Sequence, residues 1–129
     1  MISVKKILLV EDDHFTRFMM KEIFDTLGVN VDIAENGQQG CEKLDDSPGE
    51  YGLVLMDIHM PRMSGVDATK MIRQKPNDPP RNIPIIAVTA DTHYHNESVV
   101  AAHGMDGFVT KPITAGELNG LIDHYCRAA

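Results

Sequence analysis

Four apolar runs of this chain each lead directly into residues that could handle a phosphoryl group. These residues are acids after the first two runs, a hydroxyl after the third and a lysine after the fourth: Glu11, Asp12 and Asp13, then Asp57, Thr89 and Lys111. Carboxylate oxygens are ligands that Mg²⁺ prefers, and a carboxylate can also attack phosphorus as a nucleophile. The set therefore predicts a site that holds a divalent cation and a phosphoryl group.

The elements that position these residues are predicted from changes in apolar periodicity. Short apolar or alternating runs predict strands at residues 4–10, 29–34, 51–56, 83–88 and 105–109. Helical spacing predicts helices at residues 14–27, 37–44, 64–73, 92–103 and 113–125, the fourth with the weakest pattern. The prolines between residues 75 and 84 indicate a loop.

The first predicted helix carries an apolar residue at every fourth position. Phe15, Met19, Ile23 and Leu27 form one stripe, which we expect to face the core. Gly28 follows the last of them and suits a helix end.

Strands that alternate with helices of this length predict right-handed crossovers and a parallel sheet covered on both faces. The expected fold class is α/β, a flavodoxin-like (βα)5 three-layer sandwich with strand order 2-1-3-4-5. In that order the first and third strands lie about 4.8 Å apart, so the acids after the first strand and Asp57 can share one cation. The fifth strand lies roughly 10 Å from the third, a gap that the Lys111 side chain can largely span. Residue type thus matches distance, which favours this order.

Each chemical interpretation has a plainer alternative. Glu11, Asp12 and Asp57 would suffice to bind Mg²⁺, with Asp13 left to cap the first helix. The alternative is that the adjacent acids only decorate the N-terminus of that helix, where negative charge is favourable. Asp57 alone could be an ordinary turn aspartate, and Lys111 an exposed lysine at a strand end. A proline follows Lys111, and a cis bond there would fix the direction of the lysine side chain.

Composition limits the function classes. The chain has 129 residues and a net charge of −7, which fits one globular domain and argues against general binding to nucleic acid. Cys41 and Cys126 lack metal-type spacing and are expected to be reduced, as in the cytoplasm. No run approaches the roughly 20 apolar residues of a membrane helix, and the N-terminus leaves no room for a signal peptide. His93, His95 and His103 are interpreted as a solvated face of the fourth helix rather than a metal site.

Four motifs, taken in order, resemble the receiver (response-regulator) domain of bacterial two-component signalling. They are residues 8–12 (Leu-Leu-Val-Glu-Asp), 56–65 (Met-Asp-Ile-His-Met-Pro-Arg-Met-Ser-Gly), 84–90 (Pro-Ile-Ile-Ala-Val-Thr-Ala) and 104–112, which end in Thr-Lys-Pro. The order and spacing match from about residue 5 to residue 127, nearly the whole chain.

The resemblance implies a role for each residue of the site. Asp57 would accept the phosphoryl group from a phosphohistidine. Glu11, Asp12, Asp57 and the backbone carbonyl of His59 would bind Mg²⁺, and Lys111 would contact the phosphate.

The resemblance also implies a switch. Thr89 would contact the phosphate, and Phe108 would reorient with Thr89 and alter the surface formed by helix 4, strand 5 and helix 5. Two tuning positions are less typical of such domains, each two residues beyond a site residue. His59 would tune how long the phosphoryl group survives, and Asp91 would either position water or repel phosphate.

The implied function is that of a phosphoacceptor regulator, not an enzyme, although such a domain could catalyse its own phosphorylation and dephosphorylation. Its partners would be a sensor histidine kinase or a histidine phosphotransfer protein, and a downstream protein target, with no nucleic acid or membrane partner. Residues 1–129 would form a single receiver domain, either a stand-alone regulator or a piece of a larger protein. The second and fourth motifs look most like receivers attached to hybrid histidine kinases.

Three other classes compete with this interpretation. A magnesium-dependent phosphohydrolase with an aspartate nucleophile usually has a second acid two residues later, where this chain has His59. A nucleotide-binding module would need a glycine-rich phosphate loop after the first strand, and none is present. A degenerate receiver that acts only as a docking module would not need the acids, the threonine and the lysine.

Overall fold

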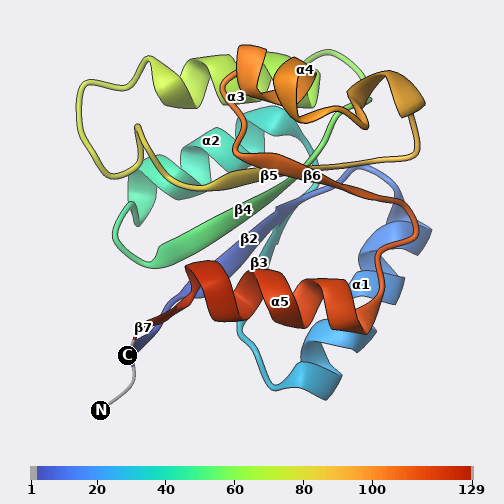
Figure 1. The fold of residues 1–129 in the computed structure, drawn as a ribbon. Helices are drawn as coiled ribbons and strands as arrows, with labels where there is room; N and C mark the ends of the chain where they lie inside the picture. The colour runs from blue at the N-terminus through green and yellow to red at the C-terminus, as the bar shows by residue number, and fades with distance from the viewer. Residues whose placement is uncertain (1–2, 129) are drawn as a thin grey trace.

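A parallel β-sheet forms the centre of the computed structural model, which describes residues 3–128 (Figure 1). Within these residues, the central sheet has five strands in the order β3-β2-β4-β5-β6. They are β2 (Lys6–Val10), β3 (Val31–Ala34), β4 (Tyr51–Asp57), β5 (Ile85–Thr89) and β6 (Gly107–Thr110). Numbered along the chain from β2, this order is 2-1-3-4-5, so the predicted flavodoxin-like topology is confirmed.

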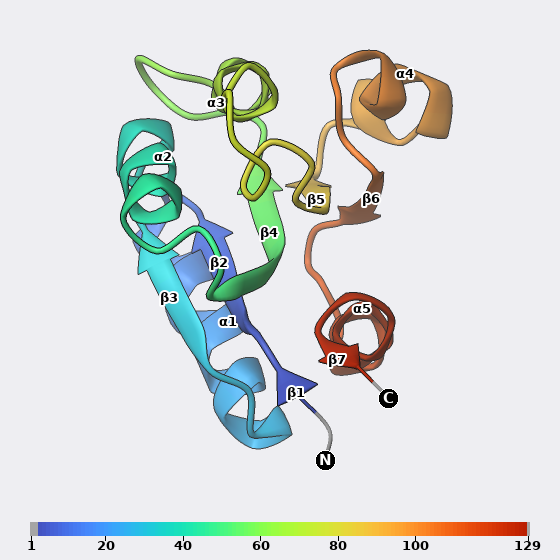
Figure 2. The ribbon, with the colours of Figure 1, turned by 90° about the vertical axis from the view of Figure 1, so that its left-hand side faces the viewer.

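Helices cover both faces of the sheet, which gives the predicted three layers (Figure 1, Figure 2). One face carries α1 (His14–Leu27) and α5 (Ala115–Tyr125). The other carries α2 (Gly37–Asp46), α3 (Gly65–Arg73) and α4 (Glu97–Ala102).

Alternate side chains of β2 enter the two layers of the core. Ile7 and Leu9 pack in the layer of α1 and α5, whereas Leu8 and Val10 pack in the layer of α2, α3 and α4. All four are 0% exposed. The part of a strand that is covered on both faces is almost continuously apolar, and Glu11, the first acid, follows directly after it.

Helices begin where the sequence supplies a capping side chain. Asp13, Asn36 and Ser64 cap α1, α2 and α3 by accepting hydrogen bonds from backbone N–H groups of the first turn. Thr114 and Glu117 form a capping box at the start of α5.

The predicted apolar stripe of α1 is wrong for two of its members. Phe15 is 68% exposed and Met19 is 48% exposed, whereas Met20 and Phe24 are buried against the sheet. The other two stripe residues are only partly buried. Because α1 has apolar residues around much of its circumference, spacing alone did not identify the face that packs on the core.

Residues 92–103 do not form the single predicted helix. A 3₁₀ turn, η1 (Thr92–Tyr94), comes first, and α4 begins only after Asn96, whose side chain accepts hydrogen bonds from Ser98 N and Val99 N. The helix restarts because Asn96 caps it.

The remaining differences lie at element ends. The first predicted strand is interrupted at Lys5, and β1 (Ser3–Val4) pairs antiparallel with β7 (Arg127–Ala128), which was not predicted. Most other predicted bounds shift by one or two residues. In the part of the chain that the structure describes, no helix is long and apolar enough to span a membrane.

Candidate functional site

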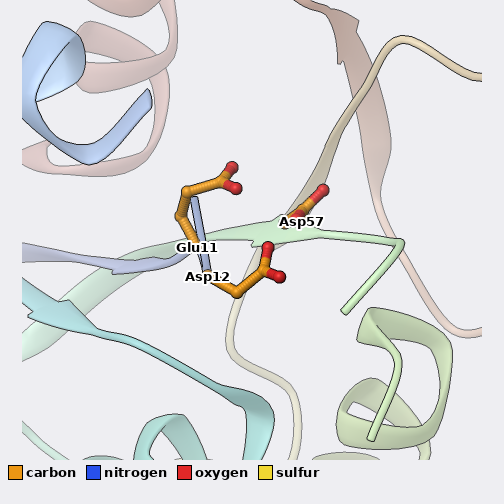
Figure 3. A group of neighbouring side chains, drawn as sticks. All are labelled: Glu11, Asp12 and Asp57. Atoms are coloured by element: carbon orange, nitrogen blue, oxygen red, sulfur yellow. The ribbon is translucent and has the colours of Figure 1, made fainter. Parts of the chain in front are cut away.

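Three carboxylates converge where β2 and β4 end (Figure 3). Val10 pairs with Met56 in the parallel ladder, so Glu11 and Asp57 follow at the same level of two neighbouring strands. One oxygen of each of Glu11, Asp12 and Asp57 lies within 4.8 Å of the others. The structure thus brings together the three side chains that the sequence predicted as cation ligands.

Lys111 reaches this cluster from the end of β6. Its Nζ lies 2.9 Å from Glu11 Oε2 and donates a hydrogen bond of 3.2 Å to Asp57 Oδ1. The Lys111–Pro112 peptide bond is cis, and Lys111 N donates to the carbonyl of Thr89. The Lys111 side chain therefore spans the two strand spacings between β6 and β4, as predicted.

Two of the three acids are held in a poorly solvated environment. Glu11 is 0% exposed and Asp57 is 4% exposed. Burial, followed by the negative charge of Glu11, raises the pKa of Asp57 to about 7, and Lys111 opposes this shift. Burial acts to lower the pKa of Lys111, but its contacts with Glu11 and Asp57 raise that pKa overall. The lysine therefore stays charged while the acids still repel one another.

The donor set fits a hard divalent cation. Glu11 Oε2 is fully buried, and the Lys111 Nζ that lies 2.9 Å away as its ion-pair partner is shared with Asp57. One ammonium charge does not offset two buried carboxylates, so a divalent cation would stabilise the cluster further. Carboxylate oxygens at close range are suitable ligands for Mg²⁺.

An open cleft of about 380 Å³ lies over these groups. Its walls include Glu11, Asp57, Thr89, Asp91 and Lys111. The cleft lies beyond the carboxyl ends of the parallel strands, where ligands bind in open α/β sheets. A phosphoryl group in this space would meet a carboxylate, a hydroxyl and an ammonium group.

Gly65 makes this edge of the sheet possible. It begins α3 directly against the end of β4, and its N–H donates to the carbonyl of Ile58 at 2.8 Å. A Cβ at this position would collide with the backbone carbonyl of Asp57. Only glycine lets the helix approach this closely, so Gly65 fixes the backbone that carries Asp57.

Thr89 and Phe108 lie on adjacent strands but make different contacts. Thr89 is 2% exposed, and its Oγ1 accepts a hydrogen bond of 3.0 Å from Asp91 N. Phe108, partly buried on β6, stacks on the ring of His95, with centroids 5.6 Å apart. The same His95 ring bonds the Thr89 carbonyl through Nε2 at 2.8 Å. His95 therefore joins the two residues that were predicted to form a switch.

The two predicted tuning residues bind each other. His59 Nε2 lies 2.7 Å from Asp91 Oδ2, which links the loop after β4 to the loop after β5 across the mouth of the cleft. The hydrogen bond from His59 is the main reason that the pKa of Asp91 is lowered. The two positions were chosen because each lies two residues beyond a site residue, and nothing in the sequence indicated that they would pair.

The expectation of one solvated histidine face is wrong. His93 lies in η1, His103 caps the end of α4, and His95 lies between the two elements with its ring engaged on Thr89 and Phe108. Sequence reasoning also missed Arg17, whose side chain bonds the backbone carbonyls of Glu11 and Asp12. The available signal was a lone arginine one turn into the helix that follows three adjacent acids.

An apolar cavity of about 320 Å³ adjoins the cleft on the side of α1 and shares Thr16 and Lys111 with it. Its lining includes Phe15 and Met19, the two residues that were predicted to face the core. Phe18, on the same helix, is 58% exposed. We call Phe15, Phe18 and Met19 the α1 patch.

Similarity to known proteins agrees with this geometry. Residues 7–123 match the family described as the response regulator receiver domain. The chain is 35% identical over 127 residues to the osmosensing histidine protein kinase SLN1 of Saccharomyces cerevisiae, covering 95% of this chain and 10% of that protein. It is 32% identical over 120 residues to the autoinducer 2 sensor kinase/phosphatase LuxQ of Vibrio vulnificus, covering 93% of this chain and 13% of that protein. The chain thus spans about a tenth of the length of these relatives.

Solved structures agree as well. The receiver domain of sensor histidine kinase PA1611 from Pseudomonas aeruginosa, which has a magnesium ion coordinated in its active site cleft, superimposes with a TM-score of 0.77 at 27% identity, covering 95% of this chain and 98% of that one. The chemotaxis protein CheY4 of Vibrio cholerae has the same fold, with a TM-score of 0.80 at 22% identity, covering 95% of this chain and 99% of that one. With the family match over most of its length, the chain belongs to the response regulator receiver domains of two-component signalling.

Proposed function

We propose that residues 1–129 act as a single phosphoacceptor domain in which Asp57 receives a phosphoryl group from a phosphohistidine in a magnesium-dependent reaction. The observation that carries the proposal is the convergence of three carboxylates and Lys111 from three strand ends on one cleft. The magnesium ion named for the PA1611 receiver domain and the histidine kinases among the relatives support it.

The cation would be held by Glu11, Asp12, Asp57 and the backbone carbonyl of His59. When bound, it would neutralise charge on the phosphoryl oxygens. An oxygen of the ionised Asp57 attacks phosphorus, so a P–O bond forms as the P–N bond to the donor imidazole breaks. Lys111, already within contact distance of Asp57 Oδ1, pairs with a phosphoryl oxygen. The domain is the acceptor in this reaction and regulates a partner, so it is not an enzyme in the usual sense.

The phosphoryl group would act on Thr89 and Phe108. Thr89 moves its hydroxyl towards the new oxygens, Phe108 turns into the space that Thr89 leaves, and the surface of α4, β6 and α5 changes. A phosphorylated carboxylate can favour a minor conformer only through contacts that the other conformer lacks, and Thr89 supplies such a contact.

The donor would cover the α1 patch. A phosphohistidine that enters the cleft brings its protein against the rim, and the apolar cavity on the α1 side shares Lys111 with the cleft. Exposed aromatic side chains beside a site are typical of protein interfaces. The donor is a sensor histidine kinase or a histidine phosphotransfer protein, and the output is a protein target in the cytoplasm rather than nucleic acid or membrane.

On the opposite rim, the His59–Asp91 pair would set how easily water reaches the phosphoryl group. Together the two side chains bridge the mouth of the cleft. This pair would therefore tune the lifetime of the phosphorylated state.

Intact mass after incubation with acetyl phosphate, and separately with a phosphorylated histidine phosphotransfer protein, tests the function. We expect one phosphoryl group to be gained only with Mg²⁺, and none in Asp57→Asn. Asp67→Asn, which changes an exposed aspartate on α3, is the matched control and should behave as the native chain. An equal gain in Asp57→Asn would show that another residue is the acceptor.

A further inference from the structure

We propose that Arg17 is a positioning residue for the cation site, holding the backbone of Glu11 and Asp12 so that both carboxylates face one ion. The inference rests on the proposed function, because the ion belongs to that function.

The Arg17 side chain donates to two consecutive carbonyls. Its Nη1 bonds the carbonyl of Glu11 at 3.0 Å and that of Asp12 at 2.8 Å. Glu11 and Asp12 lie between the end of β2 and the start of α1, outside both elements. Arg17 therefore supplies the donors that regular secondary structure supplies elsewhere.

The guanidinium is fixed on its other side as well. The Arg17 side chain is 16% exposed, and its Nη2 lies 3.6 Å from Glu35 Oε1, just beyond the end of β3. Glu11 N also donates to the carbonyl of Ala34 at the end of β3. The turn that carries the acids is thus tied both to α1 and to the neighbouring strand.

Arg17 differs in one decisive respect from Lys111, the cation that touches the acids directly. Lys111 occupies carboxylate oxygens of Glu11 and Asp57, so it competes with a metal ion for them. Arg17 bonds the carbonyls of the acids and leaves their carboxylate oxygens available. Groups that orient metal ligands without touching the metal commonly change metal affinity by about 10- to 100-fold when they are removed.

The sign of the effect separates positioning from simple charge. Arg17 is a positive group near the acids, so charge alone predicts that its removal makes Mg²⁺ bind more tightly. Loss of positioning predicts weaker binding. Calorimetric titration of Mg²⁺ into the intact chain, without a phosphoryl donor, measures this directly.

We expect Arg17→Met to weaken Mg²⁺ binding about 10-fold, and Arg17→Lys, which keeps a donor and the charge, to recover most of it. Lys21→Met removes an exposed cation one turn further along α1, which pairs with Asp25, and should leave the affinity unchanged. In phosphorylation by acetyl phosphate, the half-saturating Mg²⁺ concentration should rise in Arg17→Met while the rate at saturating Mg²⁺ stays near native. A purely structural loss would lower the melting temperature without this split.

Equal or tighter Mg²⁺ binding in Arg17→Met would overturn the proposal, and so would a loss that Arg17→Lys does not recover in part. If Arg17→Met does not fold, Arg17→Leu takes its place, since it also removes both the side-chain donor and the charge; equal or tighter binding in that variant overturns the proposal too. Failure of the proposed function is distinguishable, because it would appear in the native chain as absence of both Mg²⁺ binding and phosphorylation of Asp57.

Discussion

The two rims of the cleft are built in opposite ways. On one rim, the α1 patch presents Phe15, Phe18 and Met19 to solvent beside an apolar cavity. On the other, which we call the loop rim, His59 and Asp91 are joined by a short polar contact, and the His59 ring also meets Tyr94 edge-on at 5.8 Å. The first rim exposes apolar side chains to solvent. On the second rim, the two polar side chains bind each other.

This difference indicates a division of labour around Asp57. Apolar surface gains free energy when another protein covers it, whereas an internally bonded rim gains little and instead resists movement. The α1 patch therefore suits the approach of a donor, and the loop rim suits control of what happens after transfer. Substitutions at the floor of the cleft should therefore change phosphorylation by every donor. Substitutions on one rim should leave the role of the other rim unchanged.

The largest effect is expected at Lys111, which lines both the cleft and the apolar cavity. Lys111→Met should lower the initial rate of phosphorylation about 100-fold or more with acetyl phosphate and with a protein donor alike, because a charged contact to the phosphoryl oxygens is lost. Intact mass against time measures the rate, with the exposed Lys70→Met of α3 as control. A loss confined to the protein donor would place Lys111 in docking rather than in transfer.

The next effect is the pH dependence of stability that follows from protonation of Asp57 at the floor of the cleft. The pKa of Asp57 is raised to about 7, mainly by burial, so between about pH 4 and pH 7 the folded chain holds a proton that the unfolded chain has released. The free energy of unfolding without divalent cations should therefore fall as pH rises through this window, by about 1 to 3 kcal/mol, and level off above it. Urea unfolding at a series of pH values measures it. In Asp57→Asn the fall should be much smaller; an equal fall would assign it to other groups.

The α1 patch should matter only to a protein donor. Phe15→Ser and Phe18→Ser should each lower transfer from a phosphorylated histidine phosphotransfer protein about 10- to 30-fold, as expected for aromatic anchors of an interface. The rate with acetyl phosphate should stay native, because neither residue touches the acids. Met71→Ser, at another exposed apolar residue on α3, is the control and should change neither rate. Equal losses with both donors would indicate damage to the site instead of lost docking.

The floor of the cleft was predictable from sequence, and the reason is local. An apolar run that ends at an acid, a threonine or a lysine marks the end of a strand, and parallel topology then places all strand ends at one edge. Glu11, Asp57, Thr89 and Lys111 meet there because each lies within one or two residues of its strand end.

The rims were not predictable in the same way. Apolar side chains on α1 recur with helical spacing on more than one face, and only packing on the sheet selects Met20 and Phe24 over Phe15 and Met19. The contact between His59 and Asp91 joins two loops that are 32 residues apart in the chain. Such a pair depends on the final geometry of both loops, and neither residue carries a local signal of its partner.

The smallest effect is expected on the loop rim. His59 and Asp91 are partly exposed, with 62% and 36% of their side-chain surface accessible, so water screens the contact between them and its contribution is small. His59→Ala and Asp91→Ala should each change the rate at which the phosphoryl group is lost about two- to fivefold, while the rate of phosphorylation by the protein donor stays near native. The decay of the phosphorylated mass after removal of the donor measures this. If the contact itself controls the lifetime, the double variant should behave like either single variant, because the second substitution has nothing further to break. Strictly additive effects would mean that each side chain acts alone on the attacking water, and the loop rim would then be a pair of separate groups instead of a bridge.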